Sequence, residues 1–392
     1  MSAWEAFRWT LRSVLTDKGA VAPAVAGIVV YFLFYPLPYE PEVVHDVPVV
    51  VADYDGSSLS RELERELDAT QAIRVRGATR RVEDAVPLLQ NGTIGGIVVV
   101  PKDFRRDVLR GTPTGVTVMG NGGYIVLDGA VLQTTAEAVA DTIAPELAAR
   151  LVRSNVPPAA VLRLADAAPA LVKQPLFNTV QGYGSYVVPA TMGLIVHQLL
   201  LVAICVLIGT WVEGGRWAIA ADRGLSVRGF AGMLAGFSSL VFLALLFWIG
   251  FVFWYYDFPR AGNLFGAIVF SALYAVAVAG LGVALGCWMG TRERALQCIV
   301  ATSIPLLFLS GFAFPVESIG QPLVWFSHLL PTTPGIRGFL KLNQMGATWR
   351  ETWPEIGNLI LLAVLYTGVA WWAASRRAPG PNAAPVPVPV QG

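Results

Sequence analysis

Six stretches of this chain contain no Asp, Glu, Lys or Arg, and each is long enough to cross a lipid bilayer as a helix. They run over residues 19–39, 174–212, 229–256, 261–291, 295–316 and 356–375. A membrane-spanning helix needs roughly 20 mostly apolar residues. The chain of 392 residues is 14% charged, whereas soluble domains carry about a quarter charged residues. The sequence therefore predicts a polytopic α-helical membrane protein with six transmembrane helices.

The first stretch, residues 19–39, could be taken for a signal peptide because Arg8, Arg12 and Lys18 precede it. It ends in YFLFYPLPYEPE, where large residues and prolines stand in place of the small residues of a cleavage site. We interpret this stretch as an uncleaved first transmembrane helix.

The short connections between the stretches differ in their content of Lys and Arg. With the N-terminus in the cytoplasm, the inner segments hold Arg8, Arg12, Lys18, Arg216, Arg223, Arg228, Arg292, Arg294, Arg376 and Arg377. The opposite short loops hold only Arg260, Arg337, Lys341 and Arg350. Cytoplasmic loops of membrane proteins carry the excess of Lys and Arg. Both termini are therefore expected in the cytoplasm and residues 40–178 on the outer side.

Residues 40–178 alternate strand and helix patterns. Apolar or alternating runs at 47–53, 73–77, 94–101 and 115–121 predict strands, with helical patterns between the first three and a long helix over 124–153. This order predicts an inserted α/β domain. The sequence DYDG at 53–56 resembles the start of a calcium loop, but the later ligands are missing. A strand-to-helix turn explains it better.

Residues 1–18 form an amphipathic pattern. Trp4, Phe7, Leu11, Val14 and Leu15 follow helical spacing, and Arg8 and Arg12 lie away from them. Such a helix fits the plane of the membrane interface. It is either an ordinary interfacial anchor or a contact surface for a cytoplasmic partner.

The inner loop over residues 211–229 mixes charged and aromatic side chains, namely Glu213, Arg216, Trp217, Asp222, Arg223 and Arg228. This mixture suits a small docking helix, because charged and aromatic residues together make specific protein contacts. The alternative is a plain positively charged loop.

Small residues and prolines mark packing positions inside the predicted spans. Gly282, Gly286 and Gly290 recur every four residues, which lets helices approach closely. Such close contact between helices would serve either packing within one chain or a dimer interface. Pro189 and Pro305 are expected to kink their helices. The proline-rich residues 376–392 are expected to form a disordered cytoplasmic tail.

Several kinds of chemistry are missing from the sequence. No lysine follows a glycine, so there is no phosphate-binding loop, and the charge-free stretches offer no carboxylate for proton or sodium coupling. His45, His197 and His328 lie far apart, and Cys205, Cys287 and Cys298 all fall within predicted spans. His197 is either a packed neutral histidine or a lining group of a polar path. We expect no catalytic, cofactor-binding or metal site in this chain.

Two segments carry a resemblance to a known family. LFLSGFAFPVESIGQPLVWFSHLLPTTPGIRGFLKLNQMGA, at 306–347, resembles the fifth span and the partly embedded return of the permease subunit of type-2 ABC exporters, with Pro315, Pro331 and Pro334 in short broken helices. NTVQGYGSYVVPATMGL, at 178–194, resembles the family's entry into the second span. The layout is similar to the bacterial group with an extracytoplasmic α/β domain between the first two spans, and the likeness extends to about residue 375.

The resemblance implies a division of the chain and a set of partners. Helices 2–6 would occupy residues 179–375, with a coupling loop at 211–229 and a re-entrant-like outer segment at 315–352. Two separate cytoplasmic ATPase subunits, binding ATP and magnesium, would drive a homodimer or paired half-permease in a bacterial inner membrane. A periplasmic adaptor and an outer-membrane channel are further expected partners. The family's Arg-Glu-x-Gly-Thr motif is reduced here to Glu213 followed by two glycines.

The implied function is export of a drug or of an amphipathic, lipid-like molecule, with a path between protomers lined mainly by the second and fifth spans. Charge-free spans favour such a cargo. The alternative is a non-transporting sensor or scaffold whose outer α/β domain binds a ligand or partner. Six spans and a re-entrant-like segment exceed what anchoring requires.

Overall fold

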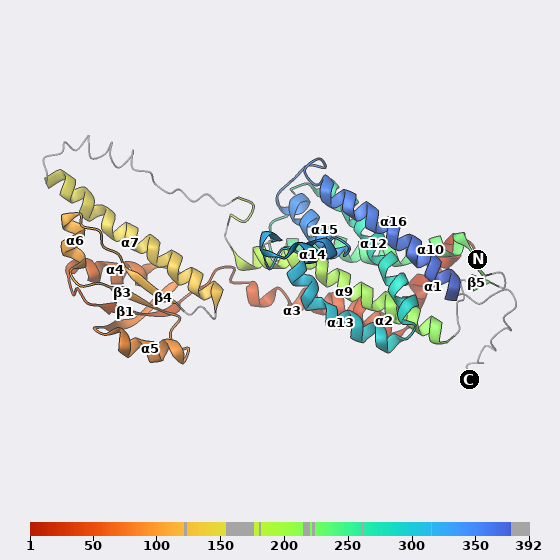
Figure 1. Ribbon diagram of the computed structural model, residues 1–392, viewed down its shortest axis with the longest axis horizontal. Coiled ribbons are helices and arrows are strands. Elements are labelled where there is room, and N and C mark those ends of the chain that lie inside the picture. The colour runs from red at the N-terminus through yellow and green to blue at the C-terminus, as the bar shows by residue number, and fades with distance from the viewer. Residues whose placement is uncertain are drawn as a thin grey trace. The chain divides into compact units, whose positions relative to one another are not determined.

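The computed structural model describes residues 1–120, 124–153, 176–179, 182–214, 220–221, 224–260, 262–314 and 316–377. The chain forms two compact units. Met1–Glu40 and Pro175–Gly392 form one, which we call the helical unit, and Pro41–Gln174 form the other, which we call the α/β unit (Figure 1).

The α/β unit is built on one four-stranded sheet, in the order β2-β1-β3-β4. Its strands are β1 (Val47–Asp53), β2 (Ile73–Thr79), β3 (Gly96–Val100) and β4 (Thr117–Gly120). β1 runs parallel to β2 and β3, and β4 is antiparallel to β3. Parallel neighbours need a crossover connection, usually a helix, and two helices supply it: α4 (Ser58–Ala69) and α5 (Val82–Gln90). Each predicted strand range contains or overlaps one of these strands.

Both faces of this sheet are buried, which explains the unbroken apolar run of β1. Val49 and Val51 pack on one face with the leucines of α4 and with Phe104. Val50 and Ala52 pack on the other face against α5. The first face is covered by α4 together with α6 (Phe104–Arg110) and α7 (Ile125–Arg153) (Figure 1). Helix α6 was not expected from the sequence, because seven residues rich in arginine give little periodic signal.

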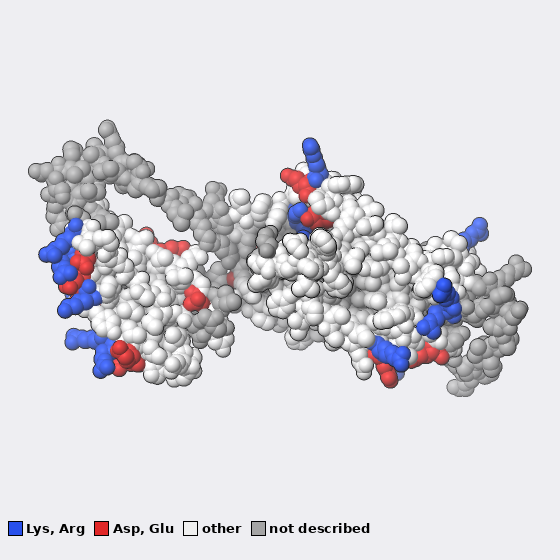
Figure 2. Space-filling view, viewed as in Figure 1, with Lys and Arg blue, Asp and Glu red and all other residues white. Residues whose placement is uncertain are grey.

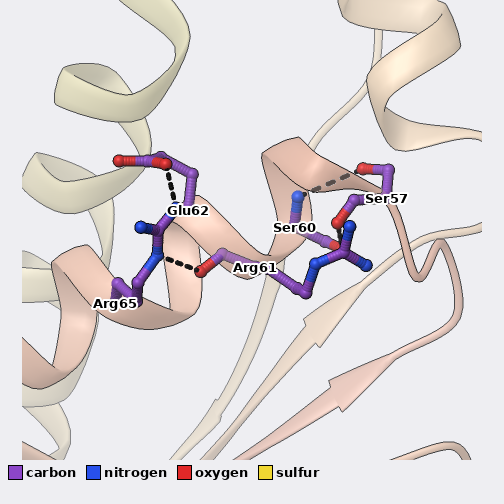
Figure 3. Close-up of polar contacts among 5 residues, drawn as sticks. All are labelled: Ser57, Ser60, Arg61, Glu62 and Arg65. Atoms are coloured by element: carbon purple, nitrogen blue, oxygen red, sulfur yellow. Dashed lines mark hydrogen bonds and ion pairs between the residues drawn. The ribbon is translucent and has the colours of Figure 1, made fainter.

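Helix α4 shows how the sequence sets an element of this unit. Ser57 is its N-cap, and the Ser57 hydroxyl accepts a hydrogen bond of 3.2 Å from the backbone N–H of Ser60 (Figure 3). Its buried leucines recur every fourth residue and face the core. On the outward side, Arg65 forms an ion pair with Glu62 and donates to the carbonyl oxygen of Arg61 at 3.3 Å (Figure 3).

The described part of the helical unit contains five helical segments long and apolar enough to cross a membrane. The first, Lys18–Tyr39, comprises α2 (Lys18–Val21), the π-helical η1 (Ala22–Gly27), α3 (Ile28–Phe34) and the 3-10 helix η2 (Leu37–Tyr39). The others are α9 (Tyr183–Glu213), α10 with η3 and α11 (Val227–Leu246, Phe247–Val252 and Phe253–Tyr255), α12 (Leu264–Met289) and α16 (Trp353–Arg377). Five such segments indicate an integral membrane protein.

The remaining predicted span, residues 296–314, coincides with most of α13 (Arg292–Leu309). This helix has 18 residues, and its first turn carries Arg292, Glu293 and Arg294. The apolar part is therefore shorter than in the other five segments, and a sixth span stays a prediction. Pro305 lies within α13 and Pro189 lies buried within α9. Both helices continue past their proline, and the predicted kinks remain predictions.

Helix α9 is the most buried of the five segments. A Cβ on Gly282 would lie 2.9 Å from Ile204, and one on Gly286 would lie 2.7 Å from Ile208. These glycines of α12 thus let it approach α9 within one chain. Gly290 differs, because its φ of +69° places it in the left-handed region, where it ends α12.

Short helices follow α13, as the prolines of this region predict. They are η4 (Val316–Ser318), α14 (Gln321–Ser327), α15 (Thr332–Phe339) and η5 (Leu340–Gln344). A Cβ on Gly335 would lie 2.2 Å from the Tyr274 ring, and one on Gly338 would lie 2.2 Å from the Phe270 ring. These two glycines therefore seat α15 against α12. Pro315 lies outside the described residues.

Candidate functional site

The N-terminal helix α1 (Ala3–Thr16) begins with a reciprocal cap. The Ser2 hydroxyl accepts from the Glu5 backbone N–H at 3.2 Å, and the Glu5 carboxylate accepts from the Ser2 backbone N–H at 2.8 Å. The hydrogen bonds from the Ser2 backbone and hydroxyl hold the pKa of Glu5 below its ordinary value. This cap satisfies helix donors that are otherwise left without partners, so the start of α1 is well defined.

Small residues seat α1 on the beginning of α10. A Cβ on Gly232 would lie 2.1 Å from the carbonyl oxygen of Ala3, and one on Gly236 would lie 3.0 Å from the Thr10 side chain. Ala6 and Thr10, one helical turn apart, are both fully buried. The two helices therefore lie almost backbone to backbone.

Two tryptophans join α1 to the end of α9. The Trp9 and Trp211 rings lie 4.5 Å apart between centroids, with an interplanar angle of 37°. Trp211 is buried, and its ring also lies 6.1 Å from the ring of Phe237 on α10. Aromatic pairs at these distances stabilise their contact beyond simple area burial. Helix α1, the end of α9 and the start of α10 thus form one packed group, which we call the α1 junction.

The predicted residues that the structure describes lie at the exposed edge of the α1 junction. Trp4 is 64% exposed and stacks on Phe7, with ring centroids 5.3 Å apart. Arg8 and Arg12 are exposed on the same helix. Glu213, the last residue of α9, and Arg228, in the first turn of α10, are also exposed. Arg216, Trp217, Asp222 and Arg223 lie outside the described residues.

The loop between α9 and α10 differs from the predicted docking helix. Its described residues form a short antiparallel pair, β5 (Ala220–Ala221) with β6 (Gly224–Leu225). Glycines at 214, 215 and 224 explain the difference, since glycine is among the poorest helix formers. The prediction of a helix is wrong for these four residues.

The side of α1 that packs on the protein is not the whole of the predicted apolar stripe. The protein-facing side consists of Ala6, Thr10 and Val14, whereas Trp4 and Leu15 remain exposed. The aromatic edge is therefore free for a membrane surface or a partner. The residues that sequence reasoning missed are Ala6, Thr10, Gly232 and Gly236. Their signal is a pair of small residues four apart in each of two segments.

Basic residues collect around the α1 junction. Arg12, Lys18, Arg228, Arg292, Arg294, Arg376 and Arg377 are all exposed. The helix ends that carry them meet, because Gly209 of α9 lies against the Arg292 backbone and Gly290 of α12 faces the Arg377 guanidinium. Figure 2 shows Lys and Arg side chains at this end of the helical unit. The surface is suited to contact acidic or polar groups outside the membrane.

The described residues contain no group of three or more His, Cys, Asp or Glu side chains that could hold a metal ion. The charges of the α1 junction lie on its surface rather than converging on a cleft. This arrangement can bind another macromolecule and transmit a displacement between helices.

Comparison with known proteins adds independent information. A family model described as ABC-2 family transporter protein matches residues 20–372. The chain is 21% identical over 393 aligned positions to the "Probable multidrug ABC transporter permease YbhR" of Escherichia coli (strain K12), covering 95% of this chain and 98% of that protein. The same protein of Escherichia coli O157:H7 gives the same figures. ABC transporter G family member 20 of Dictyostelium discoideum is 29% identical over 116 residues, which are 28% of this chain and 15% of that protein.

Proposed function

The chain belongs to the ABC-2 family of transporter proteins, and from this premise we propose that it is the membrane-spanning subunit of an exporter driven by separate ATPase subunits. The cargo is a drug or an amphipathic, lipid-like molecule. Two points support this cargo: the spans are free of charge, and a relative similar over most of its length carries the name of a probable multidrug permease. ATP and magnesium act in the partner ATPase.

The α1 junction is the proposed receiver of motion from the ATPase. The observation that carries this proposal is the tight seating of α1 on Gly232 and Gly236 together with the Trp9–Trp211 contact. Because these contacts leave little free space, a push on the exposed edge of α1 displaces the ends of α9 and α10 with it. Glu213 and Arg228 are proposed as coupling residues beside that edge.

The basic end of the helical unit is proposed to face the cytoplasm of a bacterium. The excess of exposed Lys and Arg there follows the rule for cytoplasmic loops. Both termini then lie inside, the membrane is the inner membrane, and the α/β unit is extracytoplasmic. A periplasmic adaptor and an outer-membrane channel complete the proposed assembly.

Helix α13 is proposed as a sixth span and as part of a two-protomer path with α9. Leu296, Val300, Ile304 and Phe308 recur every four residues along α13 and are 48–70% exposed. An apolar stripe of this kind faces either lipid or another protein. In the proposed dimer it faces the second protomer, whether identical or a paired half-permease.

Co-purification in mild detergent tests the ATPase partnership. Tagged wild-type protein is compared with a Glu213→Ala, Arg228→Ala double variant, and the eluate is assayed for a bound ATPase and its ATP turnover. The matched control removes another exposed acid and base, Arg81→Ala with Glu83→Ala, a pair 3.7 Å apart and 70% exposed on each side in the α/β unit.

We expect an ATPase to accompany the wild type and the control, and to be lost or uncoupled in the coupling variant. An equal yield of ATPase and an equal ATP turnover in the wild type, the control and the coupling variant would show that Glu213 and Arg228 are not part of the coupling surface. If no ATPase accompanies wild type under conditions that keep the permease assembled, the exporter proposal is wrong.

A further inference from the structure

A cavity of about 360 Å³ lies between the helices of the helical unit. Its lining comes from α9, α12 and α13, which pack against one another, and from the α14 region (Figure 1). The wall is almost wholly apolar, with Leu201, Leu285 and Leu306 among its residues. Its volume is within the range of small-molecule pockets, roughly 300 to 1,000 Å³. The cavity is therefore large enough for a small apolar body.

The cavity opens on the surface of the helical unit. Trp288 and Cys298 both line it. Trp288 is 75% exposed and Cys298 is exposed as well. Trp288 belongs to α12, one of the five candidate spans, and Cys298 belongs to α13, the proposed sixth span. With both helices in the bilayer, as proposed, a molecule dissolved there reaches the cavity without crossing water.

One strongly polar group lines the same cavity. His197 of α9 is 1% exposed, and neither of its ring nitrogens has a hydrogen-bond partner in the part of the chain that the structure describes. Beside it, Gln198 donates through Nε2 to the Ser303 hydroxyl at 3.1 Å, but the Gln198 Oε1 atom also has no such partner. A buried polar atom without a hydrogen bond costs about 1–3 kcal/mol. The His197 nitrogens are closed off from the cavity in this structure, so a bound polar group gains their hydrogen bond after a small displacement of the ring or of its neighbours.

Helix α15 packs along α9, and Thr332 at its start is a further buried polar residue. Gln344 Nε2 donates to the Ser185 carbonyl at 3.4 Å, and Gly193 lies beside Phe339 and Ile336. The two segments are therefore antiparallel. Thr332 is fully buried, and its hydroxyl has no hydrogen-bond partner among the described residues.

We propose that this cavity binds a neutral amphipathic molecule from the bilayer, with its apolar body between α9, α12 and α13 and one hydrogen-bonding group at His197. No Asp, Glu, Lys or Arg is among the described residues that line the cavity, so a charged head group would be buried without a counter-ion at high cost. A wholly apolar molecule would leave the His197 nitrogens without a partner. A molecule with one hydroxyl or amide on a hydrocarbon or aromatic body fits the apolar lining and can also form a hydrogen bond with His197. This site lies within one protomer and does not depend on the ATPase or on the path proposed between protomers.

Photolabelling tests this site in the full-length protein reconstituted into lipid bilayers, without ATP. The probe is dodecanol with a diazirine on its chain, and labelled peptides are identified by mass spectrometry. We expect labelling of the α12 and α13 peptides that line the cavity, and we expect excess unlabelled dodecanol to suppress it. Dodecyltrimethylammonium at the same bilayer concentration should not suppress it, because its head group carries a charge.

Two variants separate specific binding from contact with lipid. Leu285→Trp fills the cavity and should abolish the competable labelling. His197→Phe keeps a ring but removes the hydrogen bond, and should weaken binding about threefold to tenfold. The matched control is Leu243→Trp, which places the same side chain at a 59% exposed position of α10 and should leave labelling unchanged.

Labelling that excess dodecanol does not reduce, or that is equal in wild type and Leu285→Trp, would overturn the proposal and indicate simple partition into the bilayer. If His197→Phe does not fold, the Leu285→Trp comparison still decides the outcome.

Discussion

Trp9 of α1 packs ring on ring with Trp211 of α9, two residues before α9 ends at Glu213. The two tryptophans come from opposite ends of a long stretch of sequence, yet their contact ties the N-terminal helix to the end of the most buried span. A helix that only anchors the chain at a membrane surface does not need such a contact. Mutation of this pair therefore tests the mechanical role that we propose for α1.

Breaking the Trp9–Trp211 contact should loosen α1 and reduce coupling. In a double-mutant cycle of Trp9→Ala and Trp211→Ala, we expect an interaction of about 0.5–1.5 kcal/mol, the usual size for an aromatic pair. It is measured from thermal unfolding of the purified protein, with ATP turnover of the bound ATPase as a second readout. Trp4→Ala serves as the control, because Trp4 is 64% exposed and its removal should change unfolding little. Strict additivity of the two alanine changes would show that the rings do not act together.

Replacing Gly232 with alanine should destabilise the α1 junction, although alanine favours helices. The new Cβ would lie 2.1 Å from the Ala3 carbonyl oxygen, so α1 must move away, at a cost typical of overpacking, about 1–3 kcal/mol. At Gly368 of α16 the new Cβ would meet no heavy atom within 4 Å among the described residues, apart from its chain neighbours and the backbone of its own helix. Gly368→Ala should therefore be neutral or should stabilise by up to about 1 kcal/mol.

The opposite signs of these two changes form the test. The stability of each variant is measured as a shift in the unfolding temperature. The accessibility of α1 is measured as the rate of trypsin cleavage after Arg8 and Arg12. Faster cleavage is expected in Gly232→Ala alone. Equal behaviour of the two variants would mean that α1 is not held by Gly232.

Much of the fold follows from the spacing of charged and apolar residues. Charge-free stretches mark the five long segments because hydrocarbon excludes unpaired charge. Val50 and Val51 lie in an unbroken apolar run, and the sheet is indeed buried on both faces. Helix α13 is harder to assign as a span from the sequence, because Arg292 and Arg294 occupy its first turn and shorten its apolar part.

The candidate site was only partly predictable. Its exposed residues, Trp4, Arg8 and Arg12, could be read from amphipathic spacing within one helix. Its seating on Gly232 and Gly236 could not, because a glycine without a side chain gives no hydrophobic signal and its partner lies far away in the sequence. Contacts set by close backbone approach depend on tertiary structure, which a local pattern does not contain.

Acidification should destabilise the short helices that follow α13 through His328. Burial lowers the pKa of His328 below its ordinary value of about 6.5, and the nearby Arg337 lowers it further, while Glu355 acts in the opposite direction. In the neutral ring with its proton on Nε2, Nδ1 accepts a hydrogen bond of 2.8 Å from the Asn358 amide. The unfolded chain therefore binds a proton more readily than the folded chain does.

The contribution of His328 to the free energy of unfolding is then fully present above about pH 6.5. It is lost as the pH falls toward the lowered pKa of the folded state. We expect the unfolding temperature to drop between about pH 8 and pH 5.5, and the drop to be smaller in His328→Gln. His45→Gln, at an exposed position, should keep the wild-type profile. An unchanged profile in His328→Gln would assign the acid sensitivity to other groups.

The Lys341–Glu355 pair should behave as a partly buried ion pair. Lys341 Nζ lies 2.7 Å from Glu355 Oε1, and the side chains are 35% and 10% exposed. Glu355 Oε2 is buried without a hydrogen-bond partner among the described residues. Lys341→Met would leave a carboxylate that is mostly shielded from water and unpaired. Breaking a fully buried pair costs about 3–5 kcal/mol, and the partial exposure of Lys341 reduces this to roughly 1–3 kcal/mol.

Adding Glu355→Gln to Lys341→Met should restore much of the lost stability, because it removes the unpaired charge. The comparison uses unfolding temperatures of wild type, the single variant and the double variant. The exposed pair Arg74–Asp46, at 3.1 Å with both side chains more than half exposed, gives the reference: Arg74→Met should cost less than about 1 kcal/mol. If the double variant is less stable than Lys341→Met alone, the destabilisation arises from lost packing of Lys341 and Glu355 rather than from a buried charge.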